Sequence, residues 1–313
     1  MKIALRIPPF VVGVDGGGTK TVALVANMGG KVLGRGESGP SNYHNVGSAV
    51  ACRAIRESVS GAQHRAGLKG RKAEIAVVAL AAVDSDNDQA TAALFVHQAR
   101  IARRSLVVHD SKAALYAATH GRQGIVVISG TGCVAAGINR AGEYCRVSGW
   151  GFVVDDEGSS YDVGRKALTR AFRAIDGRAR KTSLVQLLSR RFRVKNLEDA
   201  LGLIYSTGFG ADDIADLAKV VARAARDDRA SREILKDAGI ALAESACAVA
   251  KNLRMNRESF TIALVGGTFK GGRYVIDPFK RKVTQACPHA KVRLLTIEPA
   301  QGAIMLALNA LNP

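Results

Sequence analysis

The feature that most restricts the fold of this chain is a pattern that occurs twice: three short strands joined by tight turns, with glycines in the first turn. Residues 11–15 form a short apolar run, followed by Gly-Gly-Gly-Thr-Lys-Thr and two more strand-like segments. From residue 124 the pattern returns, with Ser-Gly-Thr-Gly in the first turn. Alternating helices and strands follow each group, so the sequence predicts an internally duplicated α/β fold.

The domain division follows from this repeat. A length of 313 residues suits two domains of about 150 residues each. We expect an N-terminal lobe at residues 1–119 and a larger C-terminal lobe at 120–313, with a helical insertion at about 159–253. The final helix, 299–313, is a candidate to pack back on the first lobe.

Apolar periodicity places the individual elements. Expected strands are 11–15, 22–26, 31–36, 74–81, 105–109, 124–129, 134–138, 143–147, 260–265 and 291–295. Expected helices are 47–66, 88–99, 112–119, 159–174, 183–193, 197–205, 212–226, 231–253, one after residue 272, and 299–311.

The charge balance is strongly basic, with 45 Lys and Arg against 27 Asp and Glu, a net charge of +18. Such a surplus invites a nucleic-acid partner. However, the basic residues are dispersed, the clusters at 178–181 and 190–195 flank expected helices, and aromatic residues that could stack on bases make up only 5% of the chain. We expect no nucleic-acid partner and interpret the charge as a solvated surface that attracts anionic ligands.

Cysteines and apolar segments indicate the compartment. The five cysteines are an odd number without a Cys-x-x-Cys pair, so they predict small buried side chains rather than a disulfide framework or a zinc site. The most apolar run, 125–138, is broken by glycine and is too short for a membrane helix. The segment 1–10 lacks the long apolar core of a signal peptide. We therefore expect a cytoplasmic protein without a membrane partner.

The first glycine turn has the composition of a phosphate site. Gly16, Gly17 and Gly18 carry no Cβ, so their N–H groups can approach an anion closely. Asp15, at the strand end, could hold Mg²⁺ through water, while Thr19 and Lys20 address phosphate oxygens. The segment resembles a Walker A loop but reverses the final pair, and a strand rather than a helix follows. A plain hairpin turn is the alternative.

Two further glycine turns extend this interpretation. Gly130, Thr131 and Gly132 lie at the matching place of the second half, where a paired loop would help to clamp a polyphosphate. Gly266 and Gly267 open Gly-Gly-Thr-Phe-Lys-Gly-Gly, between a strand and a helix. Small residues there would let an adenine or a ribose lie against the backbone, whereas an ordinary strand-to-helix turn is the alternative.

Five segments together carry a family resemblance that covers nearly the whole chain. In order they are DGGGTKT, VVHDSKAAL, SGTG, GWGFVVDDEGSSYDVGRKAL and LVGGTFKGG. The chain resembles the actin, hexokinase and Hsp70 superfamily. Within it, the chain is similar to N-acetylglucosamine kinases and archaeal broad-specificity hexokinases of the BadF/BadG/BcrA/BcrD-type ATPases. The GWG…DEGS segment is the most specific element.

The resemblance implies a duplicated ribonuclease-H-like fold, two lobes with ATP and Mg²⁺ in the cleft, and phosphate transfer to a sugar hydroxyl. Its implied site residues comprise a catalytic base, nucleotide contacts and sugar contacts. They are Asp110 as base, Thr19 and Thr131 at the phosphates, Gly266, Gly267 and Lys270 at adenosine, and Asn42, Gly149, Trp150, Gly151 and Asp156 at the sugar. Residues 81–86 and Cys133 depart from the pattern of N-acetylglucosamine kinases, so the sugar stays open.

Several of these residues also have purely structural interpretations. Asp110 follows a strand end, where a carboxylate can accept a hydroxyl proton, but it could instead cap a helix beginning near Lys112, unless Ser111 does so. We expect His109 to point to the opposite face as a packed residue. The acids at 155–157 could cap a helix and offset its dipole, and Trp150 could cover a sugar or fill a gap between lobes.

The leading hypothesis is an ATP-dependent sugar kinase acting on the 6-hydroxyl of glucose, glucosamine, N-acetylglucosamine or a similar sugar. The sequence does not decide between a monomer and a homodimer. The alternative from the same family is an ATPase activator of a dehydratase or reductase, which would hold an iron–sulfur cluster with cysteines from two subunits. A third hypothesis is a non-enzymatic module that binds nucleic acid or senses a sugar.

Overall fold

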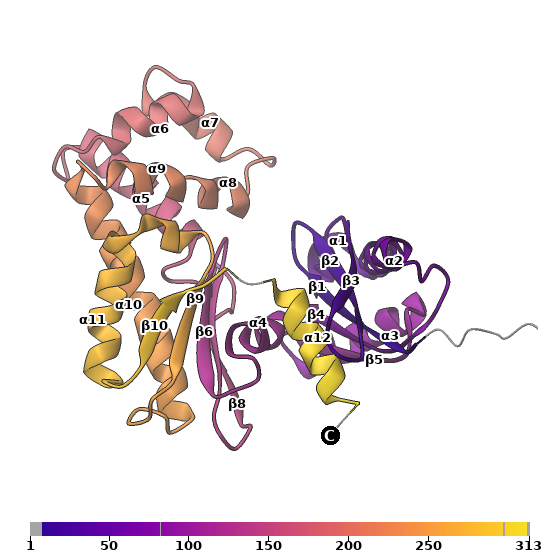
Figure 1. Ribbon diagram of the computed structural model, residues 1–313. Helices are drawn as coiled ribbons and strands as arrows, with labels where there is room; N and C mark the ends of the chain where they lie inside the picture. The colour runs from indigo at the N-terminus through magenta and orange to yellow at the C-terminus, as the bar shows by residue number, and fades with distance from the viewer. Residues whose placement is uncertain (1–7, 82, 297, 312–313) are drawn as a thin grey trace, which may run out of the picture. The chain divides into compact units, whose positions relative to one another are not determined.

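Two five-stranded mixed sheets organise the chain, each in its own compact unit (Figure 1). The computed structural model describes residues 8–81, 83–296 and 298–311. Unit 1 comprises the described residues up to Arg122 together with those that follow residue 297, and unit 2 is Gln123–Thr296. The segment 1–7, on which part of the signal-peptide prediction depends, lies outside the described residues. Among the described residues, no helix is both long and apolar enough to cross a membrane.

The sheet of unit 1 has the strand order β3-β2-β1-β4-β5. Strands β1 to β3 form an antiparallel meander, and β4 and β5 continue the sheet in parallel with β1. The strands are β1 (Phe10–Gly16), β2 (Thr21–Asn27), β3 (Val32–Ser38), β4 (Ala73–Leu80) and β5 (Ala102–His109). The helices are α1 (Tyr43–Val46), α2 (Ser48–Arg65), α3 (Asp86–Ala99), α4 (Asp110–Thr119) and α12 (Pro299–Asn309).

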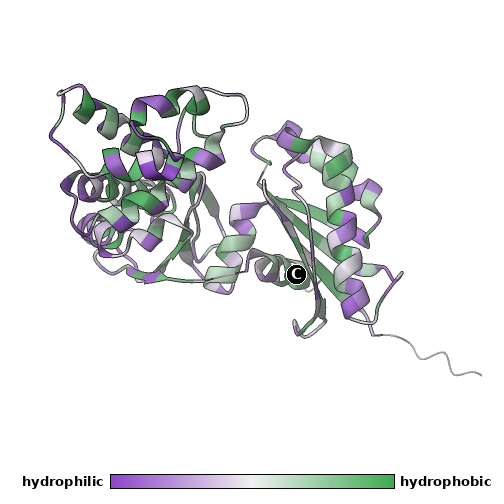
Figure 2. Ribbon diagram, turned by 90° about the horizontal axis from the view of Figure 1, so that it is seen from above, coloured by the Kyte–Doolittle hydropathy of each residue, from purple (hydrophilic) through white to green (hydrophobic). Residues whose placement is uncertain are grey.

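Helices cover both faces of this sheet, which explains why its central strands are apolar along most of their length (Figure 2). Side chains of β1 alternate between two cores, because successive residues of a strand point to opposite faces. Val12 packs with α2 and α3, whereas Val11 packs with α4 and α12. A Cβ on Gly13 would lie 2.5 Å from the Ala300 carbonyl oxygen, so α12 runs directly against β1.

The sheet of unit 2 has the order β10-β9-β6-β7-β8, the same topology as in unit 1. Its strands are β6 (Gly124–Ser129), β7 (Cys133–Ile138), β8 (Tyr144–Val147), β9 (Thr261–Val265) and β10 (Lys291–Leu294). The remaining elements are helical: α5 (Ser160–Ile175), α6 (Leu184–Phe192), η1 (Leu197–Ala200), α7 (Leu201–Ile204), α8 (Ala211–Asp216), α9 (Ala218–Ala224), α10 (Arg229–Asn252), η2 (Thr268–Gly271) and α11 (Arg273–Ala286).

One apolar core joins the helices of unit 2 to the sheet. It contains Ile125 and Val127 of β6, Leu242 of α10 and Phe279 of α11. The identical strand order of the two sheets confirms the predicted duplicated α/β fold.

Some predicted elements differ from those observed. The segment α1 was not predicted, because four residues are too few to show a helical period. The helix expected at 212–226 is two helices that meet at Leu217. The helix expected from residue 112 begins at Asp110, which changes the surroundings of that carboxylate.

Candidate functional site

The first glycine loop connects β1 to β2 in unit 1. The Gly17 N–H donates to the Lys20 carbonyl oxygen at 3.0 Å. A Cβ on Gly16 would lie 2.3 Å from Ser41 Oγ, so packing requires glycine there. At Gly17 and Gly18 the nearest atoms would be 3.5 and 3.9 Å away, which is ordinary contact. Protein packing therefore does not require these two glycines, whereas close approach of a ligand to the backbone would.

Asn42 lies beside this loop. The Gly17 carbonyl oxygen accepts hydrogen bonds from the backbone N–H groups of Ser41 (3.0 Å) and Asn42 (3.1 Å). The Asn42 side chain accepts from the His44 N–H at 3.2 Å and caps α1. Buried Thr21 donates to the Gly39 carbonyl oxygen at 2.7 Å and thereby fixes the segment from the other side. The structure thus brings Asn42 together with the glycine loop.

Thr19 and Lys20 complete the loop and are exposed. Lys20 Nζ lies 3.7 Å from Glu37 Oε2, and the Lys20 side chain is 58% exposed. An ion pair between two exposed side chains contributes little to stability, so Lys20 can leave it for another anion.

Asp15 lies at the end of β1 in an environment that disfavours its charge. Burial and the negative charges of Asp110 and Glu298 raise the pKa of Asp15 to about 7, and Lys20 offsets this only in part. The two neighbouring negative charges therefore favour the protonated form of Asp15.

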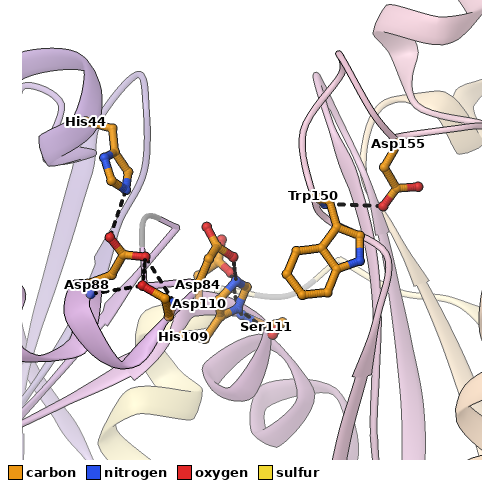
Figure 3. Close-up of polar contacts among 9 residues, drawn as sticks. His44, Asp84, Asp88, His109, Asp110, Ser111, Trp150 and Asp155 are labelled. Carbon is orange, nitrogen blue, oxygen red and sulfur yellow. Dashed lines mark hydrogen bonds and ion pairs between the residues drawn. The ribbon is translucent and has the colours of Figure 1, made fainter.

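Asp110 is the first residue of α4, directly after β5 (Figure 3). Its side chain is 29% exposed, and its Oδ1 has no hydrogen-bond partner among the described residues. A helix N-terminus favours a negative charge. Asp110 does not cap α4, because His109 does: the His109 side chain accepts from the Ser111 N–H at 3.1 Å.

The position of His109 corrects the expectation that it points away from Asp110. His109 Nδ1 lies 2.9 Å from Asp110 Oδ1 and 2.6 Å from Ser111 Oγ, and its Nε2 lies 3.3 Å from Asp84 Oδ1 (Figure 3). The alternation of a strand stops at residue 109, because the helix begins with the next residue. Strand periodicity therefore gave the wrong side for this ring.

A second polar cluster in unit 1 was not predicted. Tyr43 donates a short hydrogen bond to Asp88. His44 Nε2 lies 3.2 Å from the same carboxylate (Figure 3). Burial and Asp88 raise the pKa of Tyr43 to about 12, while the hydrogen bond from Tyr43 lowers the pKa of Asp88. These residues are 45 positions apart, so no local sequence signal could join them.

In unit 2, the second and third glycine turns lie together. Ser129 Oγ donates to Thr268 Oγ1 at 2.7 Å, and Thr268 Oγ1 also lies 2.9 Å from Ser160 Oγ. A Cβ on Gly266 would lie 2.2 Å from the Ser129 carbonyl oxygen, and Gly266 has φ 115°, so only glycine fits there. Gly267 and Lys270 are exposed beside this network.

The loop Gly130–Gly132 is attached to the start of α5. The Ser160 N–H donates to the Gly130 carbonyl oxygen at 2.8 Å. A Cβ on Gly130 would meet nothing within 4 Å, so this backbone is open to a ligand. Thr131 Oγ1 donates to Asp212 Oδ1 at 2.8 Å, a contact with α8 that the sequence did not indicate.

Asp156 lies beneath this loop. Its Oδ1 accepts from the Cys133 N–H at 2.9 Å, and a Cβ on Gly132 would lie 2.8 Å from its Oδ2. The residue is 5% exposed, and burial raises the pKa of its carboxyl. Its observed contacts hold the glycine loop. The cap of α5 is Ser159, which accepts from the Asp162 N–H at 3.1 Å, so the acids 155–157 do not cap that helix.

Gly149, Trp150 and Gly151 form a loop with positive φ at both glycines. The Trp150 N–H donates to Asp155 Oδ2 at 3.2 Å (Figure 3), and the Arg146 guanidinium lies 4.7 Å from the centre of the indole ring. Trp150 is 63% exposed. Within unit 2 its indole therefore presents open apolar surface.

Comparison with known proteins identifies the family. Residues 12–307 match the BadF/BadG/BcrA/BcrD ATPase family. The chain belongs to this family. An N-acetylmuramic acid/N-acetylglucosamine kinase of Clostridium acetobutylicum is 31% identical over 95% of this chain and 98% of its own length. An N-acetyl-D-glucosamine kinase of Dictyostelium discoideum is 31% identical over 96% of this chain and 98% of its own length.

A solved structure supports the fold independently. A protein from Chromobacterium violaceum, whose name associates it with N-acetylglucosamine kinases, matches with a TM-score of 0.78 at 27% identity. The match covers 96% of this chain and 99% of that one. The fold is therefore that of the actin-like ATPases, as the sequence predicted.

Proposed function

We propose that this chain is an ATP-dependent sugar kinase that transfers the γ-phosphate of ATP to the 6-hydroxyl of a hexose or amino sugar. Glucose, glucosamine and N-acetylglucosamine are the candidate substrates. The observation that carries the proposal is the Asp110 carboxylate, whose Oδ1 has no hydrogen-bond partner in the described part of the chain. The kinase names of two full-length relatives support the same reaction.

For this reaction, the chain has to align the sugar hydroxyl with the γ-phosphate and remove the hydroxyl proton. The sugar O6 forms a bond to the γ-phosphorus while the bond from that phosphorus to the β,γ-bridging oxygen breaks, and ADP leaves. Asp110 Oδ1 takes the O6 proton, and Asn42 would orient the sugar. In unit 2, Gly149, Trp150, Gly151 and Asp156 are the proposed sugar contacts, with the indole of Trp150 against the apolar face of the sugar.

We assign nucleotide contacts in each unit separately. In unit 1, Gly17, Gly18, Thr19 and Lys20 would hold phosphate oxygens. In unit 2, the paired turns at 130–132 and 266–270 would do the same for phosphate and adenosine, through Thr131, Lys270 and the glycine backbone. Open space at Gly130, and only ordinary contacts at Gly17 and Gly18, support this assignment.

The residues fit Mg²⁺ as the metal. Among the described residues, no group of three or more His, Cys, Asp or Glu could hold a metal ion. Mg²⁺ usually keeps several waters and binds one or two carboxylates together with substrate phosphates. Asp15, whose pKa is raised by burial and by the charges of Asp110 and Glu298, would hold it through water. When bound, Mg²⁺ neutralises charge on the phosphate oxygens.

Cys133 and Cys145 do not fit the iron–sulfur cluster that the activator function requires. Cys145 pairs with Gly137 across β7 and β8, and Cys133 precedes Gly137 by four residues. Four strand residues span about 13 Å, too far for two ligands of one cluster. Burial and the charge of Asp156 raise the pKa of Cys133 to about 12, which disfavours the thiolate that binds iron.

The test is ADP release with a sugar panel of glucose, glucosamine, N-acetylglucosamine, N-acetylmuramic acid and mannose, with Mg²⁺. We expect turnover with at least one sugar and little without. Asp110→Asn should lower kcat at least about 100-fold and leave ATP bound, because a general base contributes 10² or more. Glu57→Gln, on the exposed side of α2, is the matched control. ATP hydrolysis that needs no sugar and survives Asp110→Asn would refute the proposal.

A further inference from the structure

His109 has more contacts than its role as a helix cap needs. Its ring lies between Asp84, from the segment after β4, and Asp110, from α4 (Figure 3). The side chain is 15% exposed, so both nitrogens are largely shielded from water. Each nitrogen faces a different carboxylate, Nε2 at 3.3 Å from Asp84 and Nδ1 at 2.9 Å from Asp110.

The contact with Ser111 fixes which nitrogen of the neutral ring carries the proton. A backbone N–H can only donate, and the Ser111 N–H donates to His109 Nδ1 at 3.1 Å. Nδ1 is therefore the acceptor in this arrangement. The remaining proton belongs on Nε2, where the negative charge of Asp84 favours it.

This tautomer has a direct effect on Asp110. Because its single lone pair accepts the Ser111 N–H, Nδ1 carries no proton that it could donate to Asp110 Oδ1, which lies 2.9 Å away. This explains why Oδ1 has no hydrogen-bond partner in the described structure. In the opposite tautomer, Nδ1 would carry the N–H and donate a hydrogen bond to Asp110 Oδ1. That hydrogen bond would compete with the proton that Oδ1 has to accept from the sugar hydroxyl.

We propose that His109 is a positioning residue for Asp110, and that Asp84 acts through it by holding the ring proton on Nε2. The inference rests on the proposed function, in which Asp110 is the base. The imidazole caps the first turn of α4 and thereby fixes Asp110, while its tautomer leaves Asp110 Oδ1 available for the proton of the acceptor hydroxyl. A base oriented by a third group follows the general logic of catalytic triads.

A double-mutant cycle tests the route from Asp84 to Asp110. Asp84→Ala should lower kcat about 10-fold with unchanged KM for ATP, a fraction of the 10² or more that a general base contributes. His109→Asn keeps an acceptor at the Nδ1 position and is a favourable N-cap, so it should retain kcat within about threefold. In the His109→Asn background, Asp84→Ala should cost nothing further.

Two more variants distinguish the effect of helix capping on stability from the effect of His109 on catalysis. His109→Ala removes both the cap and the positioning group, and it should lower kcat by about 10-fold or more as well as Tm. Ser85→Ala, which removes the cap of α3 in the same unit (3.2 Å to the Asp88 N–H), should lower Tm but not kcat. If His109→Ala does not fold, the cycle with His109→Asn still decides.

The outcomes distinguish the two levels of the argument. Full kcat in His109→Ala, or an equal loss from Asp84→Ala in both backgrounds, would overturn the role of His109 while wild-type turnover kept the sugar-kinase assignment intact. Wild-type protein without sugar-dependent turnover would instead remove the proposed function, and the inference with it.

Discussion

Replacing Asp15 by asparagine should stabilise the protein at alkaline pH, although it removes a carboxylate that we assign to metal binding. The pKa of Asp15 is raised from 3.8 to about 7 by burial, Asp110 and Glu298. The folded protein therefore retains a proton that the unfolded chain loses near pH 4. The stability associated with that proton is fully present below pH 4 and is lost as the pH rises through 7.

The magnitude follows from the size of the shift. One pKa unit corresponds to about 1.4 kcal/mol, so the raised pKa of Asp15 lowers the free energy of unfolding by about 2 kcal/mol at pH 5 and by about 4 kcal/mol at pH 8, relative to pH values below 4. Asp15→Asn avoids this cost. Since 1 kcal/mol changes Tm by about 2–4 °C in domains of 150–250 residues, the gain in Tm should be several degrees larger at pH 8 than at pH 5.

The assay is thermal unfolding of the wild type, Asp15→Asn and the control Glu57→Gln across pH 5–8, without divalent cations and again with Mg²⁺. Mg²⁺ should raise the Tm of the wild type at pH 8, because it neutralises the carboxylate, and should have less effect on Asp15→Asn. Parallel Tm profiles of wild type and Asp15→Asn over this pH range would refute the reasoning about Asp15.

Two further predictions concern the loops. Gly18→Ala should weaken ATP binding about 10-fold or more but change Tm little, because the added Cβ would meet no protein atom closer than 3.9 Å. Gly16→Ala should instead lower Tm, because its Cβ would lie 2.3 Å from Ser41 Oγ. Calorimetric ATP titration and thermal unfolding distinguish these two effects. Trp150→Ala should raise the sugar KM several-fold and leave Tm nearly unchanged, because Trp150 is 63% exposed; an unchanged KM in steady-state kinetics would exclude the indole from the sugar site.

Local patterns predicted the elements of the fold well, because they depend on burial and turns that short segments encode. The strand expected at residues 124–129 has the same bounds as β6. The repeated glycine turns indicated a duplication, and the two sheets have the same strand order. The start of α4 was placed two residues late, because His109 is an unusual N-cap and the sequence offered Ser111 instead.

The glycine loops could be found by composition, whereas their supporting contacts could not. Thr131 pairs with Asp212, 81 positions away, and Ser129 with Thr268, 139 positions away. Only the folded chain brings such residues together. Asp156 shows the same limit: its sugar contact remains a prediction, and the sequence did not indicate that its carboxylate accepts the Cys133 N–H.

Helix α12 packs against β1 and α4 and completes one of the two apolar cores of unit 1. A Cβ on Gly302 of α12 would lie 1.8 Å from the Ala113 carbonyl oxygen, and α12 supplies Ala300, Ala303 and Ile304 to one of the two cores of unit 1. During synthesis the sheet of unit 1 is made first, but the face that packs on α4 and α12 stays incompletely covered until α12 has been made. Unit 2, whose segments are contiguous, can finish folding earlier, so truncating the C-terminus should harm the oldest part of the nascent chain most.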